Sequence, residues 1–234
     1  MAQREPVTRD SWKRMLSSAV AIFDELKARD MALPDVILGG GTVLMFRFEH
    51  RLSKDIDFFL RDVQWLGFLS PRLNEAIAAM IDGYEEQANS VKLIFPAGDI
   101  DFVAAGAVTN AEPTDKLEFH GYSFPLESTE EILAKKLLYR PASFKPRDVF
   151  DLAVAIEKDP KAAARAVTAT SSRREVLSRR LEHLAQLGHA ELAKDILPIG
   201  DFSRILGSML GTVARFVKDS LRPAPGESDA GFKP

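Results

Sequence analysis

The chain has 234 residues, of which 46% are hydrophobic and 28% charged, as is ordinary for a soluble globular protein with one large core or two small ones. It contains no cysteine, which excludes a disulfide framework and a thiolate metal site, and its four histidines show no zinc-binding spacing. No apolar run reaches membrane-spanning length, and the first residues lack the pattern of a signal peptide. We therefore expect a cytoplasmic protein with no membrane partner.

The net charge of −3 does not by itself indicate a nucleic-acid binder, but the charge is unevenly distributed. Residues 161–222 contain eleven Lys and Arg against six Asp and Glu, a local net of +5 that leaves −8 for the rest. A basic surface attracts polyanions, so this segment is either a contact for RNA or a solvated helical face. Aromatic residues do not alternate with the clustered arginines, so stacking on single-stranded bases gets no support. These arginines are Arg173, Arg174, Arg179 and Arg180.

Up to residue 126 the sequence predicts a mixture of helices and strands. Apolar residues recur at helical spacing near the N-terminus and after the acidic strand, and β-branched runs separate these segments. In chain order we expect helix 8–30, strand 36–38, a helix opening at Thr42, a strand through residues 55–60, helix 65–80 with Pro71 as a kink or new start, and strands 84–95, 100–108 and 117–124, the last with Gly121 at a turn.

From Ser128 onward the pattern is almost wholly helical, and Ser128 with Glu131 forms a capping box that predicts a helix start. The expected helices are 128–139, 146–158, 160–169, 173–187 and about 200–219. The fold class is therefore α+β, a mixed sheet with flanking helices followed by a helical C-terminal half. We expect a domain over 1–126, a helical domain over 127–222, and a disordered tail over 223–234, where three prolines and two glycines occur.

Asp55 and Asp57 stand two residues apart in an otherwise apolar run that favours a buried strand. The period of two places both carboxylates on one face and turns Ile56 and Phe58 into the core. Carboxylate oxygens at this spacing suit Mg²⁺, which keeps several waters and whose coordination a triphosphate could complete. An isolated pair of this kind is a weak signal, because paired surface acids are common and usually solvated.

Two glycines, Gly40 and Gly41, precede Thr42, which we expect to open the next helix. Glycine lets the backbone approach a ligand closely, and the N–H groups and dipole of a helix start favour a phosphate, to which the Thr42 hydroxyl adds a donor. Alone, such glycines more often form a tight turn. Residues 43–54 are long enough for a short helix and a turn, so the glycines and Asp55 can meet in space.

In this order and spacing, residues 40–42 and the pair Asp55 and Asp57 resemble the signature of the DNA polymerase beta-like nucleotidyltransferase superfamily. A closer similarity, which includes Arg51 and Ser53, is to the AbiEii/AbiGii toxin family of nucleotidyltransferases. The resemblance implies a nucleotidyltransferase-type sheet in which residues 1–126 are the catalytic core and the helical domain closes the cleft.

The resemblance also implies that Arg51 contacts the nucleotide phosphates, whereas Lys54 beside it is a weaker candidate, and either could instead pair with Asp55 or Glu49. Ser53 could donate to a phosphate or cap the entry to the strand. Glu49 stands where the toxin family often has glycine, which leaves the conformation of this loop open but not the metal site.

The superfamily usually brings a third carboxylate from a later strand, and Asp99 and Asp101 are the candidates. Asp101 is preferred, because Ile100 and Phe102 beside it point to the opposite face, whereas Asp99 follows Pro96–Gly98 and is expected in a turn. The alternative is an acid at the strand edge with no ligand.

Lys136 shares a stripe with apolar residues on the helix after Ser128, and residues 147–152 are similar to the second half of the toxin family's pattern. Read alone, Lys136 would be a surface lysine and Asp148 part of an ion pair with Arg147. The resemblance implies that Lys136 contacts the nucleotide phosphates and that Asp148 or Asp151 orients it or assists the attacking group. Asp148 is our first choice.

Together these features predict a nucleotidyltransferase that uses Mg²⁺ and a nucleoside triphosphate. Asp55, Asp57 and Asp101 would hold two metal ions about 4 Å apart, which lower the pKa of the attacking hydroxyl and neutralise the pyrophosphate. Similar toxins modify RNA, notably tRNA ends, and act with an antitoxin partner, so we expect an RNA acceptor such as tRNA. The sequence does not indicate which nucleoside triphosphate (ATP, GTP or CTP) the protein uses.

Two alternatives remain open at this point. The chain could transfer the nucleotide to a protein hydroxyl, which predicts label on polypeptide and none on RNA. It could also be a non-catalytic nucleotide-binding scaffold, although the presence of the two metal acids, Lys136 and Asp148 argues against that reading.

Overall fold

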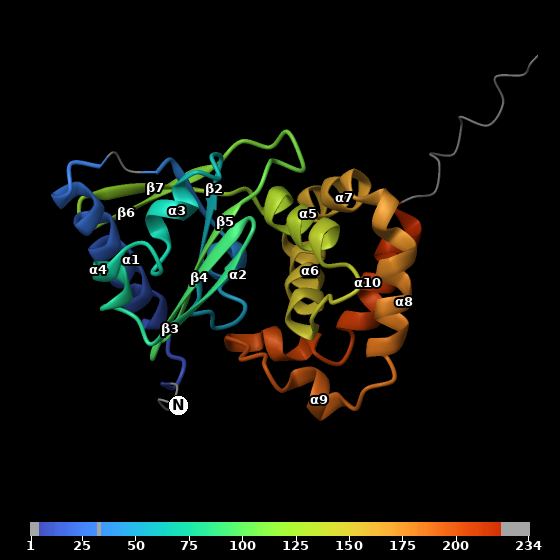
Figure 1. Cartoon of the computed structure of the whole chain (residues 1–234). Helices are drawn as coiled ribbons and strands as arrows, with labels where there is room; N and C mark the ends of the chain where they lie inside the picture. Colours follow the sequence, from blue (N-terminus) through green and yellow to red (C-terminus); the bar gives the residue numbers. More distant parts are fainter. Residues whose placement is uncertain (1–4, 32–33, 221–234) are drawn as a thin grey trace, which may run out of the picture. The chain divides into compact units, whose positions relative to one another are not determined.

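The computed structural model describes residues 5–31 and 34–220, so the expected tail at 223–234 lies outside the described residues. The chain divides into two compact units, which we call the sheet unit (1–132 and 196–203) and the helical unit (133–195 and 204–234). Figure 1 shows the strands in the first unit and the yellow-to-red helices in the second. The expected division into a catalytic core over 1–126 and a helical domain over 127–222 stays a prediction.

The sheet unit is built on a seven-stranded mixed sheet with the order β3-β4-β5-β2-β1-β7-β6. The pairs β2–β5 and β1–β7 are parallel, and the other neighbours are antiparallel. This sheet and the helices that follow it confirm the α+β class. The strands are β1 Val36–Gly39, β2 Ile56–Leu60, β3 Gly83–Gln87, β4 Ser90–Phe95, β5 Gly98–Ala104, β6 Asp115–Phe119 and β7 Tyr122–Leu126.

One face of the sheet packs on α1 (Ser11–Ala28), the blue helix in Figure 1. Phe23 of α1 contacts the rings of Phe58, Phe102 and Phe124, which come from three different strands. Because side chains alternate along a strand, burying Phe58 on this face turns its neighbour Asp57 to the other face. The aromatic core thus decides which side of the sheet carries the acids.

The helix expected over 65–80 is wrong in extent: the structure has two short helices, α3 Trp65–Leu69 and α4 Glu75–Ala78. Ser70 ends α3 with extended backbone, since a residue before proline avoids the helical region. Asn74 then begins α4 by accepting a hydrogen bond from the Ile77 N–H at 3.3 Å. The proline therefore lies in a turn between two helices and does not kink one long helix.

Two of the expected strands are hairpins. Residues 84–95 divide into β3 and β4 at a turn through Ala88 and Asn89. Asparagine favours turns. Residues 117–124 divide into β6 and β7 at His120 and Gly121, whose φ angles of 47° and 81° fit a two-residue turn of type I′. The expected strand 100–108 instead runs from Gly98 to Ala104.

The helical unit centres on α6, which contacts α7, α9 and α10, while α10 also packs on α8. The helix expected over about 200–219 is wrong only in extent: it ends with α10 as expected, but a 3₁₀ segment (Gly200–Ile205) and a turn precede α10. Helix α9 was not expected. No helix in the described part of the chain is long and apolar enough to cross a membrane. The helices after β7 are α5 Thr129–Tyr139, α6 Pro146–Lys158, α7 Pro160–Ala169, α8 Arg174–Leu184, α9 His189–Ala193 and α10 Met209–Asp219.

Candidate functional site

A row of facing residues crosses five strands of the sheet, and it contains two of the candidate acids. Glu85 on β3 faces Lys92 on β4, Lys92 faces Asp101 on β5, Asp101 faces Asp57 on β2, and Asp57 faces Gly39 on β1. Directly facing residues in a sheet project their side chains to the same side. We call this the five-strand row, and it brings two sequence-predicted acids, Asp57 and Asp101, next to each other.

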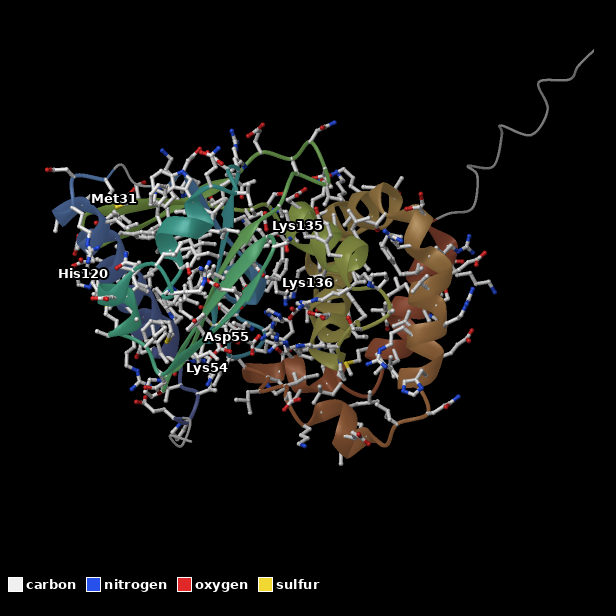
Figure 2. All side chains as sticks on the ribbon, viewed as in Figure 1. Met31, Lys54, Asp55, His120, Lys135 and Lys136 are labelled. Atoms are coloured by element: carbon white, nitrogen blue, oxygen red, sulfur yellow. The ribbon has the colours of Figure 1, made fainter. Side chains whose placement is uncertain are left out.

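Asp55 lies one step before β2, where Figure 2 labels it together with Lys54. Its Oδ1 accepts a hydrogen bond from the Asp99 N–H at 3.2 Å. A second pair of acids, Asp55 and Asp99, therefore lies two residues before the facing acids of the row, on the same two segments. Asp99 is the second residue of β5 and its side chain is buried, which corrects the expectation that it belongs to a turn. The strand begins earlier than expected because Gly98 already pairs with Phe95 on β4.

The acids of the row repel one another. Burial and the charges of Asp57 and Asp55 raise the pKa of Asp101 to about 7, although Lys92 acts in the opposite direction. The Lys92 Nζ lies 3.4 Å from Asp101 Oδ2. Burial works to lower the pKa of Lys92, but the carboxylates of Asp101 and Asp99 outweigh it and raise that pKa, so Lys92 is an ammonium at neutral pH.

Sequence reasoning did not single out Lys92. The alternation of Val91, Leu93 and Phe95, all buried, indicates that Lys92 points away from the core. That pattern says nothing about which residue of the neighbouring strand faces it. The β4–β5 register supplies Asp101 as the partner.

The glycines make room for the side chains of the site itself. Gly40 has a φ of +70°, and a Cβ atom there would overlap the Asp57 carboxylate. A Cβ atom on Gly41 would lie 2.5 Å from Arg51 Nη2. Helix α2 (Gly40–Phe48) begins at the first of these glycines and not at Thr42, which corrects the expected helix start.

Thr42 connects the start of α2 to the segment that carries Asp55. Its side chain is fully buried, and its hydroxyl donates to the Asp55 carbonyl oxygen at 2.6 Å and lies 2.9 Å from Ser53 Oγ. The expected role of Thr42 and Ser53 in phosphate binding stays a prediction. In the structure both residues hold the loop before β2 against α2.

Arg51 is buried beside the glycine turn, and its Nη1 donates to the Leu52 carbonyl oxygen at 3.2 Å. Its backbone forms an isolated antiparallel bridge with Pro198. The guanidinium group is therefore held close to Gly41, at the start of α2. A cation in this position suits a phosphate that approaches the N-terminus of that helix.

A segment from much later in the chain supports the Arg51 loop. The Leu52 N–H donates to the Leu197 carbonyl at 2.8 Å, and the Ile199 N–H donates to the His50 carbonyl at 2.9 Å. We call residues 196–203 the brace. Neither periodicity nor a motif indicated it, because its role depends on a pairing between residues about 150 positions apart.

Glu49, the residue that departs from the family pattern, ends α2 in the left-handed conformation with a φ of 48°. Glycine adopts this conformation most readily. The loop therefore has the backbone shape that a glycine would favour, and the departure changes the residue and not the turn.

In the helical unit, Lys136 lies between two acids of α6; Figure 2 labels it next to Lys135 on α5. The Lys136 Nζ is 2.5 Å from Asp151 Oδ2 and 3.2 Å from Asp148 Oδ1. Arg140 Nη2 also donates to Asp148 Oδ1, at 2.8 Å. Both candidate acids thus contact Lys136, and Asp151 is the nearer. The catalytic assignment of Asp148 over Asp151 stays a prediction.

Asp148 has a second task at the start of α6. Its Oδ2 accepts a hydrogen bond from the Lys145 N–H at 3.1 Å, as a helix cap does. Burial would raise the pKa of Asp148, but the charges of Lys136 and Arg140 more than offset it and hold that pKa below the usual value. The carboxylate is therefore ionised at neutral pH.

The Ser128 cap is only half of the expected capping box. Ser128 Oγ accepts from the Glu131 N–H at 3.1 Å, as expected. The Glu131 carboxylate instead accepts from the N–H groups of Val108 and Thr109 and from the Thr109 hydroxyl, at 2.7–2.8 Å. It therefore holds the loop after β5.

The acids of the row suit Mg²⁺ as ligands. Within residues 5–31 and 34–220, no three His, Cys, Asp or Glu side chains form a closed metal-binding group. Mg²⁺ needs no such cage, because it commonly takes one or two carboxylates and completes its shell with water and phosphate. Burial raises the pKa of Asp101 most, and the charges of Asp57 and Asp55 raise it further; a divalent cation would relieve this second contribution.

The family model described as nucleotidyl transferase AbiEii toxin, type IV TA system, matches residues 26–222. This match covers most of the chain, and it contains the glycine turn, all the candidate acids and Lys136. The chain therefore belongs to a nucleotidyl transferase family. That family is the AbiEii toxin family of type IV toxin–antitoxin systems, which confirms the sequence resemblance. Comparison with curated proteins gives no match.

Proposed function

We propose that this protein is a Mg²⁺-dependent nucleotidyltransferase that transfers a nucleoside monophosphate from a nucleoside triphosphate to an RNA acceptor such as tRNA. Family membership supports the reaction class. The observation that carries the proposal is the five-strand row, which sets Asp57 and Asp101 side by side against the glycine turn. The expected cytoplasmic location and an antitoxin partner complete the proposal.

In this reaction an acceptor oxygen attacks the α-phosphorus, the bond from that phosphorus to the pyrophosphate oxygen breaks, pyrophosphate leaves, and the acceptor oxygen gives its proton to water. Mg²⁺, which we expect as two ions on Asp55, Asp57 and Asp101, would supply positive charge for the attacking hydroxyl and the leaving pyrophosphate. Asp57 and Asp101 would fix the position of these ions, because β2 and β5 hold the two side chains in register.

The phosphates would lie at the start of α2. The backbone N–H groups of Gly40 and Gly41 begin this helix, and Arg51 supplies a fixed guanidinium beside them. Ser53 and Thr42 border the same turn. From the family resemblance we add Lys136, with Asp148 orienting it, as a further phosphate contact.

An RNA acceptor is favoured over a protein hydroxyl by the charge of the helical unit. Three exposed arginines lie here: Arg173 just before α8, Arg174 at its start and Arg179 further along it. Arg180 is not part of this exposed group, because its Nε donates to the Phe144 carbonyl at 3.0 Å. Exposed arginines attract phosphate backbones without reading sequence.

The test is incubation with Mg²⁺, each α-labelled nucleoside triphosphate, and either total tRNA or cell lysate. Asp57→Ala is the variant, and Asp35→Ala, at an exposed position just before β1, is the matched control. We expect label on RNA with the wild type and with Asp35→Ala. We expect none with Asp57→Ala, although its circular dichroism should remain that of the folded protein.

Each other outcome has a definite meaning. Label on polypeptide and none on RNA would replace the RNA acceptor by a protein hydroxyl. Label on neither would favour a non-catalytic scaffold. A fully active Asp57→Ala variant, or transfer that survives excess EDTA, would contradict the proposed mechanism.

A further inference from the structure

Lys92 is a charged residue of the five-strand row for which the proposed chemistry has no task. It faces Asp101 on one side and Glu85 on the other. Its ammonium lies 3.4 Å from Asp101 Oδ2, and the Lys92 and Asp101 side chains are 32% and 19% exposed. A pair this far removed from solvent is screened less than an ordinary surface ion pair.

The neighbours of this pair are acidic. Asp57 faces Asp101 from the next strand, and Asp99 and Glu85 both act on Lys92 through their charges. Without Lys92, the carboxylates of Asp57 and Asp101 would face each other, and β4 would supply no positive charge to offset theirs. Like charges in directly facing positions destabilise a sheet.

We propose that Lys92 is the resident counter-ion of Asp101. In the metal-free protein its ammonium offsets part of the negative charge of the Asp57–Asp101 pair, and it competes with a divalent cation for the Asp101 carboxylate. Lys92 is thus a positioning residue that does not ligate the metal. Its charge weakens the binding of metal that arrives without nucleotide. The inference rests on the proposed function, because it takes Asp57 and Asp101 to be metal ligands.

The competition follows from Coulomb's law. A cation that enters beside Asp57 and Asp101 meets the repulsion of the nearby ammonium or must displace it from Asp101. A triphosphate brings negative charge of its own, which offsets that repulsion. Removal of the Lys92 charge should therefore strengthen metal binding most when no nucleotide is present.

The experiment is a titration of the nucleotide-free full chain with Mn²⁺ at fixed ionic strength, followed by calorimetry or by electron paramagnetic resonance of the free ion. The variants are Lys92→Met, which removes the charge, and Lys92→Arg, which keeps it. Lys116→Met is the control, since Lys116 is exposed on β6 and faces Pro125. We expect Lys92→Met to bind Mn²⁺ about tenfold more tightly than the wild type. The other two should stay within about twofold.

A double variant separates the proposal from a general change in structure. Asp101→Asn in the Lys92→Met background removes the carboxylate on which the effect depends, so the gain in affinity should disappear. A thermal scan gives a second readout. Metal-free Lys92→Met should unfold at a lower temperature than the wild type, and Mn²⁺ should raise its Tm by more than it raises that of the wild type.

Equal or weaker Mn²⁺ binding by folded Lys92→Met would overturn the counter-ion role and leave the proposed function standing. So would a gain in affinity that persists in the double variant. The proposed metal site itself would fail under a different result, in which the wild type binds no Mn²⁺ even with a non-hydrolysable triphosphate present.

Discussion

Gly40 and Asp57 lie on neighbouring elements at a distance that leaves no room for a side chain between them. The φ of +70° at Gly40 is a conformation that residues with a Cβ adopt at a cost of about 1–2 kcal/mol. The overlap with the Asp57 carboxylate adds to that cost, because Asp57 sits in the middle of the sheet and cannot move far.

We predict that Gly40→Ala abolishes nucleotide transfer and weakens Mn²⁺ binding, since the methyl group would push the Asp57 carboxylate out of the row. The protein should lose about 2 kcal/mol of unfolding free energy, measured by urea denaturation. Gly67→Ala is the control, because a Cβ there meets no atom within 4 Å. Normal transfer by Gly40→Ala would show that the close approach has no functional consequence.

Asp148 makes a different kind of contribution, since it is a fully buried carboxylate with two cations and a backbone N–H as partners. Its folded-state pKa lies below the ordinary 3.8. A carboxylate of this kind stabilises the folded state at every pH above its unfolded pKa. That stability is lost as the pH falls through the lower, folded pKa.

We predict that Asp148→Asn lowers the free energy of unfolding by about 3 kcal/mol at neutral pH, because it leaves buried cations undercompensated. The difference from the wild type should shrink as the pH falls below the ordinary 3.8 and through the lowered pKa of Asp148, where the carboxylate becomes protonated. Urea titrations of both proteins across this range measure the difference. Asp195→Asn, at an exposed position of the helical unit, should show no such trend. A difference that is independent of pH would contradict the ion-pair explanation.

At the scale of elements, the brace connects residues 196–203 to the loop that presents Arg51. Two backbone hydrogen bonds, Leu52 N–H to Leu197 and Ile199 N–H to His50, hold the two segments together. The His50 ring also packs against Phe202, with ring centroids 6.4 Å apart. The brace therefore restricts the loop without contributing a side chain to the acids of the row.

We predict that Ile199→Pro, which removes the N–H donor to His50, raises the KM for the triphosphate by about threefold to tenfold and changes kcat less. The reason is that Arg51 would lose its fixed position and not its charge. Steady-state kinetics with varied triphosphate give this comparison. Leu197→Ala keeps both hydrogen bonds, since its side chain is exposed, and should behave like the wild type. A loss confined to kcat would argue against the brace as a support for Arg51.

At the scale of the whole molecule, charge is segregated along the chain: a net of +5 over residues 161–222 against −8 elsewhere. An acidic remainder repels polyanions, so an RNA acceptor should be drawn to the exposed arginines near the start of α8. Binding that depends on phosphate contacts releases counter-ions and weakens steeply with salt.

We predict that Arg174→Glu weakens tRNA binding by about fivefold to tenfold at low salt, and that tRNA affinity of the wild type falls as salt rises. Filter binding or fluorescence anisotropy with total tRNA measures both effects. Lys116→Glu makes the same charge change in the sheet unit and should have little effect. If the two variants weakened binding equally, net charge and not the surface near α8 would explain the attraction.

How well a site residue could be predicted from the sequence depended on how close its partners lie to it in the chain. Asp55, Asp57 and the glycines lie within one stretch, where the period of a strand and the start of a helix already relate them. Boundaries were less certain: Pro71 divided one expected helix into two, and a turn at Ala88–Asn89 divided one expected strand, whereas the turn at Gly121 was expected. In both cases a local turn preference overrode the hydrophobic pattern.

The amino-acid order alone therefore determined the α+β class, the family resemblance and which carboxylates we propose as metal ligands, because these depend on residue types and short spacings. The tertiary structure decided that Lys92 faces Asp101, that the brace supports Arg51, and that Lys136 contacts Asp148 and Asp151 together. Strand register and helix contacts join residues that are distant in the chain. Such pairings are selected by burial of the whole core and not by any local pattern.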